Sequence, residues 1–100
     1  MTRASRPFEF ENYDELLRDP KNAAAYLADF LESGDMDLFQ EALRHVAKAQ
    51  EGGIKAVAEQ ADLGRESLYK SLSRGGNPQM ATINKMLAAL GMRLTVTAVR

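Results

Sequence analysis

The sequence predicts a single all-α domain of five or six helices that ends in one C-terminal β-strand. Three observations support this fold class. Apolar residues recur at three- and four-residue spacing through most of the chain, cap residues and glycines separate these stretches, and the spacing changes to two over the last nine residues. The chain has 100 residues, of which 45% are hydrophobic and 27% charged, a balance typical of one folded domain with one core.

The first predicted elements are an arm and a short helix. Residues 1–11 form an N-terminal arm without helical periodicity, in which residues 8–10 are a candidate extended piece. Asn12 and Glu15 have the spacing of a capping box, which satisfies backbone N–H groups at the start of a helix. This pair predicts a short helix that continues through residues 16 and 17.

Two longer helices follow, each opened by an aspartate. Asp19 is a candidate N-cap, and Pro20 suits the first helical position because proline lacks the N–H that stays unpaired there. Gly34 ends this helix, and Asp35 caps the next one. We assign residues 12–51 to an acidic N-terminal helical region. The apolar face of its third helix consists of Leu38, Phe39, Ala42, Leu43 and Val46.

The second half of the chain, residues 52–91, is predicted to contain three more helices. A pair of glycines at residues 52–53 breaks the preceding helix, and Gly91 stops the last one. A loop rich in glycine, asparagine and proline separates the last two helices. The predicted helices lie at residues 54–61, 65–73 and around 83–90.

The tail, residues 92–100, is predicted to form the β-strand. Apolar and polar side chains alternate there and several are β-branched, which is typical of a strand with one buried face. Apart from residues 8–10 the chain offers no convincing partner strand, so we expect pairing between two chains, either with a second copy or with another protein. The alternative is a frayed tail. The residues predicted to form the dimer contact are Leu94, Val96 and Ala98.

Charge is distributed unevenly although the net charge is only −1. Residues 1–51 hold six Lys and Arg against eleven Asp and Glu, which gives −5. Residues 52–100 hold seven against three, which gives +4. An acidic half joined to a basic half indicates two charged partners, and the alternative is a chance asymmetry of a small domain.

Residues 54–73 have the spacing of a helix-turn-helix unit, with two short helices on either side of a three-residue step. Ala58 lies where the two helices would cross, and a small side chain allows their close approach. Asp62 occupies the turn position that requires a left-handed backbone, which aspartate tolerates. Leu63 is placed to fill the core beneath the turn.

The second helix of this unit is a candidate DNA recognition helix. If Leu68 and Leu72 face the core, the residues on the other face can hydrogen-bond base edges in the major groove. The alternative is an ordinary solvated helix face followed by a plain connecting loop. The predicted base-reading residues are Arg65, Glu66, Tyr69 and Lys70. The predicted phosphate-binding residues are Lys55, Ser67, Ser71, Arg74 and Asn77.

Composition argues against several classes of site. The sequence has no cysteine, which excludes disulfides and thiolate metal sites and suits a cytoplasmic protein. His45 is the single histidine and lacks a nucleophile or paired carboxylates, so we expect no metal, no cofactor, no small-molecule substrate and no enzymatic activity. No apolar run approaches the length of a membrane span, and no segment resembles a signal peptide.

The segment at residues 54–72 resembles the addiction-module antidote family of antitoxin-like regulators. Arg-Glu-Ser-Leu-Tyr at residues 65–69 and Gly-Asn-Pro at residues 76–78 carry the most specific part of the likeness, which extends over residues 10–94. Asp62 departs from the family pattern, which usually has glycine there. The resemblance implies a lambda-repressor-like, Xre-type helix-turn-helix bundle with extra N-terminal helices.

The resemblance also implies a bacterial or phage protein that is encoded beside a toxin of the RelE superfamily, neutralises that toxin and represses the shared operon as a dimer. We therefore predict a sequence-specific transcriptional regulator and antitoxin whose partners are double-stranded operator DNA, the cognate toxin and a second copy of the chain. Residues 12–51 are the predicted toxin-binding region and residues 52–91 the DNA-binding region. The alternative is an interaction module that binds a toxin and uses the helix-turn-helix only as scaffold.

Overall fold

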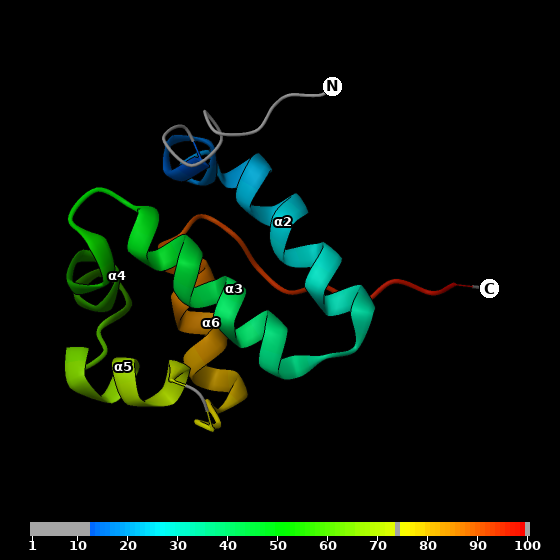
Figure 1. Cartoon of the computed structure of the whole chain (residues 1–100). Coiled ribbons are helices and arrows are strands. Elements are labelled where there is room, and N and C mark those ends of the chain that lie inside the picture. Colours follow the sequence, from blue (N-terminus) through cyan, green and yellow to red (C-terminus); the bar gives the residue numbers. More distant parts are fainter. Residues whose placement is uncertain (1–12, 74, 100) are drawn as a thin grey trace.

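The computed structural model describes residues 13–73 and 75–99, whose regular structure is entirely helical (Figure 1). The predicted arm, residues 1–11, and the predicted cap Asn12 lie outside the described residues. The all-α class is confirmed for the described part, and no helix there is both long and apolar enough to cross a membrane. A helical stretch at residues 13–17 is followed by α2 (Pro20–Ser33), α3 (Met36–Ala49), α4 (Gly53–Ala61), α5 (Arg65–Leu72) and α6 (Met80–Ala89).

Two aspartates start the long helices α2 and α3, as the sequence predicts. The Asp19 side chain accepts a hydrogen bond from the N–H of Lys21 at 2.9 Å, and the Asp35 side chain accepts one from the N–H of Leu38 at 3.2 Å. Gly34 ends α2 with a φ of 79°, a left-handed conformation that glycine adopts without steric cost. The side chains of Asp19 and Asp35 each satisfy a backbone N–H that the first turn of a helix leaves unpaired.

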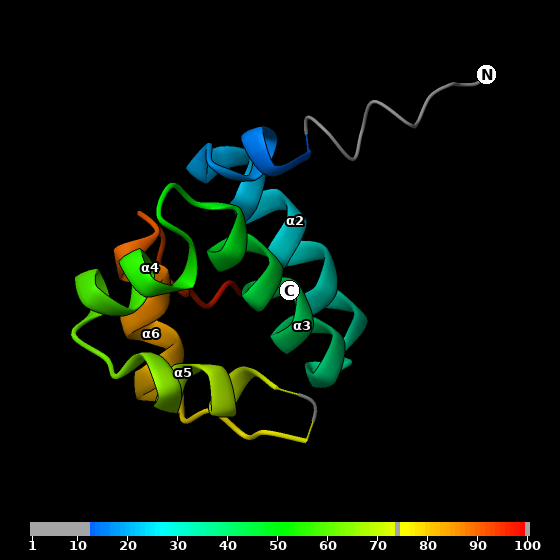
Figure 2. The same cartoon turned by 60° about the vertical axis from the view of Figure 1, so that its left-hand side comes forward.

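Helix α3 is the central element of the bundle. It contacts α2, α4 and α5, while α6 contacts α4 (Figure 2). Full burial of each large apolar side chain contributes roughly 1.5–3 kcal/mol, so the core holds the later helices firmly to α3. The largest fully buried side chains are Phe39, Leu43, Val46, Leu68, Leu72 and Met86.

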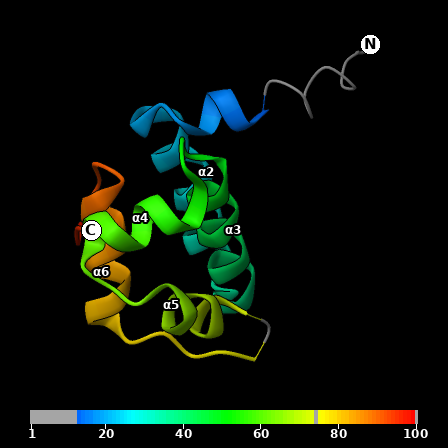
Figure 3. The same ribbon diagram turned by 90° about the vertical axis from the view of Figure 1, so that its left-hand side faces the viewer.

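Polar side chains tie the helical stretch at residues 13–17 to the end of α3. The Arg18 guanidinium Nε donates to the carbonyl of Ala49 at 2.7 Å, and Gln50 Nε2 donates to the carbonyl of Leu17 at 3.0 Å. Helix α5 lies at the other end of the molecule from this stretch, as Figure 3 shows. The helical stretch at residues 13–17 and α5 therefore lie on different surfaces of the molecule, while α3 reaches both.

The predicted C-terminal β-strand is wrong, because residues 92–99 have no regular secondary structure. The period-two pattern persists only at the start, where Met92 and Leu94 pack against the core. Val96 is 99% exposed, and Ala98 is exposed as well. A strand needs a partner for its backbone N–H and C=O groups, and the described residues provide none. The alternating side chains therefore belong to a tail that first packs on the core and then leaves it.

Candidate functional site

Helices α4 and α5 are joined by a turn of three residues, 62–64. Asp62 has φ 59° and ψ 46°, so the left-handed conformation predicted at this position is confirmed. The N–H groups of Asp62 and Leu63 donate to the carbonyls of Glu59 and Ala58 at 3.2 and 2.8 Å, the paired hydrogen bonds of a Schellman motif. Leu63 is half-buried against the core. The turn thereby sets the direction in which α5 leaves α4.

Helix α5 has one buried face and one exposed face. Leu68 and Leu72 are 1% and 2% exposed, and α5 contacts both α3 and α4. This confirms the predicted orientation of the helix, in which the two leucines face the core. The side chains on the opposite face are all exposed: Arg65, Glu66, Ser67, Tyr69 and Lys70.

The exposed face of α5 borders a shallow groove whose other wall includes Arg44 of α3. Arg44 was not among the residues predicted from the sequence. Together with Arg65 and Lys70 it brings three positive charges to the groove, where Glu66 supplies one negative charge. The groove thus combines a net positive charge with the exposed ring of Tyr69. Both features suit the binding of a polyanion that contains stacked rings.

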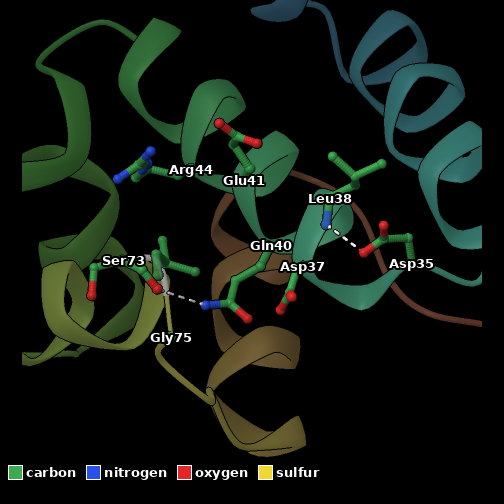
Figure 4. A pocket seen from close by; sticks show the side chains of 9 residues that line it. Asp35, Asp37, Leu38, Gln40, Glu41, Arg44, Ser73 and Gly75 are labelled. Carbon is green, nitrogen blue, oxygen red and sulfur yellow. Dashed lines mark hydrogen bonds between the residues drawn. The ribbon is translucent and has the colours of Figure 1, made fainter.

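A side chain of α3 fixes the end of α5. Gln40 Nε2 donates to the carbonyls of Ser71, Ser73 and Gly76 at 2.8, 3.1 and 3.2 Å, and Figure 4 draws the bond to Ser73. An amide nitrogen has two hydrogens, so at least one of them is shared between two acceptors. The carbonyl of Ser71 lies in the last turn of α5, where backbone carbonyls lack a partner within the helix. Gln40 therefore caps α5 and holds the following loop at the same time.

The loop after α5 comes back against the helix at Gly76. A Cβ atom at this position would lie within 3.0 Å of the carbonyl oxygens of Lys70 and Ser71. Glycine is therefore the residue that fits here without a shift of the backbone. The first residue of the Gly-Asn-Pro sequence at 76–78 thus has a packing role directly behind the exposed face of α5.

Other predicted site residues lie elsewhere. Lys55 is exposed on α4 and does not border the groove. Asn77 borders a separate hollow beside the start of α3, and Ser71 is half-buried. Arg74 lies outside the described residues. In the described part of the chain, no three histidine, cysteine, aspartate or glutamate side chains are grouped as a metal site needs.

A row of aromatic rings lies where α2 packs against α3. The rings of Tyr13, Tyr26 and Phe30 meet edge to face, with successive centroid distances of 5.6 and 5.1 Å. The Tyr26 hydroxyl oxygen lies 3.4 Å from Nδ1 of His45 on α3. Burial, together with Tyr13 and the Glu41 carboxylate, raises the pKa of Tyr26 to about 12, so its hydroxyl stays protonated at neutral pH.

Comparison with known proteins finds a likeness over nearly the whole chain. A family model described as "Probable addiction module antidote protein" matches residues 6–98. An uncharacterized protein of Haemophilus influenzae is 31% identical over 96 residues, which cover 96% of this chain and 94% of that protein. No solved structure matches the chain significantly.

Proposed function

Because this chain belongs to the addiction module antidote family and its partner is a toxin, we propose that it neutralises a RelE-superfamily toxin and represses its own operon by binding DNA. In this proposal α4 and α5 form a helix-turn-helix of the lambda-repressor-like, Xre type. Helix α5 enters the major groove of the operator, and the acidic N-terminal helices bind the toxin in the cytoplasm. Helix α3 belongs to both surfaces in this proposal, because its residue Arg44 borders the groove of α5.

The exposed face of α5 is the observation that carries the DNA-binding part of the proposal. Arginine can form two hydrogen bonds with a guanine edge, and glutamate can accept from the amino group of cytosine. Lys70 can reach guanine or a phosphate, and the ring of Tyr69 can pack on a thymine methyl group. Buried Leu68 holds these side chains from behind. We assign base reading to Arg65, Glu66, Tyr69 and Lys70.

Phosphate contacts come from the two walls of the groove. Arg44 on α3 faces the same groove as Ser67 on α5, so both can contact the sugar-phosphate backbone while α5 lies in the major groove. Lys55, Ser71 and Asn77 are weaker candidates because they are half-buried or lie away from the groove.

We propose that the chain binds DNA as a homodimer. Its two α5 helices would lie about 34 Å apart and enter the major groove at successive turns on one face of the duplex. The exposed end of the tail offers a contact for the second copy, through Val96 and Ala98. Leu94 contributes less because it packs on its own core. Deletion of residues 95–100 should convert the dimer to a monomer in light scattering, and a truncated dimer would place the contact elsewhere.

The test of DNA binding is a titration of the protein's own promoter fragment at several salt concentrations. We expect affinity to fall steeply as salt rises, because bound cations are released from the phosphates. Arg65→Ala should weaken binding by about 1–3 kcal/mol and relax specificity at one base pair. Lys85→Ala is the matched control, since Lys85 is an exposed cation on α6 outside the groove. Equal losses in the two variants would remove Arg65 from the reading face.

The second candidate function is an interaction module that binds the toxin without independent DNA binding. The −5 charge of residues 1–51 favours it, because an acidic surface can bind a basic protein without help from α5. The same titration separates the two functions. Retained toxin binding without any affinity for the promoter would support the interaction module.

A further inference from the structure

The surface along the junction of α2 and α3 combines apolar, aromatic and acidic groups. We call it the α2–α3 seam and define it by Tyr26, Phe30, Leu38, Glu41 and His45. Tyr26 and Phe30 are half-buried, so that each ring leaves part of its surface in solvent. Leu38 is 42% exposed at the start of α3, although it is a large apolar side chain. Leu38, Glu41 and His45 are spaced by three and four residues and therefore follow one face of α3.

The seam is bordered by carboxylates. Glu41 is exposed and lies close enough to Tyr26 to raise its pKa. Asp29 is exposed on α2 three residues after Tyr26, so it lies on the same side of that helix. Residues 13–49 hold eight Asp and Glu against four Lys and Arg, a net charge of −4. A surface with this charge favours a positively charged partner and disfavours nucleic acid.

We propose that the α2–α3 seam is the docking surface for a cationic face of the toxin, which inserts arginine or lysine side chains between the aromatic row and the carboxylates. This inference rests on the proposed function and specifies where its protein partner binds. The partly exposed rings of Tyr26 and Phe30 can accept a guanidinium against their faces while Asp29 and Glu41 pair with its N–H groups. Leu38 supplies the apolar anchor that such an interface needs at its centre.

The seam adjoins the groove of α5 along α3. Leu38 and Glu41 line one pocket together with Gln40 and Arg44, the residues that cap α5 and border its groove (Figure 4). Leu38 projects toward α2, and Glu41 lies one helical turn before Arg44. A toxin on the seam therefore lies next to the exposed face of α5.

The opposite edge of α2 borders a different groove and carries no such combination of groups. It is lined mainly by apolar side chains of α2, α6 and the tail, among them Leu31, Leu87 and Leu94. Leu31 is 38% exposed, which nearly equals the exposure of Leu38. Glu32 is the one acidic residue among the described residues that line this groove. The two edges of α2 therefore supply matched positions for an experiment.

The experiment measures the affinity of the chain for the purified protein encoded beside its own gene, by calorimetry. The seam variant is Asp29→Lys with Glu41→Lys, and the control is Glu32→Lys with Glu59→Lys, which changes the net charge equally at exposed sites off the seam. Leu38→Ala and Leu31→Ala form a second pair without charge changes. Circular dichroism and thermal unfolding show that each variant is folded.

We expect the seam charge variant to bind the toxin at least roughly thirtyfold more weakly and Leu38→Ala roughly tenfold more weakly, with both controls within about threefold of wild type. Equal losses in the two charge variants would assign the effect to net charge and overturn the proposal. Unchanged binding of the seam variants, or a loss of self-association in place of toxin binding, would overturn it too. A wild-type chain that binds no toxin would refute the proposed function itself, which distinguishes that failure from the failure of the seam.

Discussion

Replacement of Gln40 by leucine should loosen α5 at the end that faces the groove. The variant keeps an apolar stem, although its side chain is one atom shorter, and it removes both N–H groups that serve the carbonyls of Ser71, Ser73 and Gly76. A hydrogen bond contributes a net 0.5–1.5 kcal/mol, and a part-buried carbonyl left without a donor adds to the loss. Loss of the two donors should therefore lower the free energy of unfolding by about 2 kcal/mol, which corresponds to a fall in Tm of roughly 10 °C for a domain of this size.

Urea unfolding followed by circular dichroism measures this loss directly. The control is Gln60→Leu, because Gln60 is exposed on α4. Gln40→Glu should be at least as destabilising at neutral pH, since it points a carboxylate at three carbonyl oxygens. Promoter affinity of Gln40→Leu should fall as well, because the end of α5 is no longer held. A loss below about 0.5 kcal/mol, or equal to that of the control, would refute the capping role of Gln40.

Three further predictions address the turn, the loop and the aromatic row. Asp62→Gly should raise the free energy of unfolding by roughly 0.5–1 kcal/mol in urea titrations, because glycine adopts a φ of 59° without the steric cost that aspartate bears; a destabilised variant would contradict the strain argument. Gly76→Ala should lower stability by about 1–3 kcal/mol through the clash of its Cβ with the carbonyls of α5, and a neutral effect would show that the loop can move away. Tyr26 has a pKa of about 12 in the folded chain, above its ordinary value of 10.0, so the stability it contributes is full below pH 10 and is lost as the pH rises toward 12. The free energy of unfolding should therefore decline between pH 10 and 12 more steeply in wild type than in Tyr26→Phe, and parallel curves would exclude this linkage.

The sequence predicts those features of the fold that depend on neighbours along the chain. Helix starts at Asp19 and Asp35 follow from caps that bond within three residues, and the structure has both. The inward direction of Leu68 and Leu72 follows from helical periodicity. The left-handed backbone conformation of Asp62 can be predicted because a short turn between two helices usually requires it at this position.

The features that were missed or wrong depend on residues far apart in the sequence. Gln40 caps a carbonyl 31 residues away, and Arg44 reaches the groove only because α3 lies beside α5. An outward-facing arginine on a helix gives no local sign of which helix it approaches. The prediction of a strand in the tail is wrong for the same reason. Alternating side chains form a strand only when another strand is near, and the described residues hold none beside Val96.

Contact between the exposed face of α5 and operator DNA can be observed residue by residue if amide NMR shifts are mapped while the promoter duplex is added. We expect the largest changes at residues 65–70 and at Arg44, while Tyr26 and Phe30 of the α2–α3 seam stay unchanged. Changes confined to the seam, or an unaffected α5 in the presence of bound duplex, would contradict this contact.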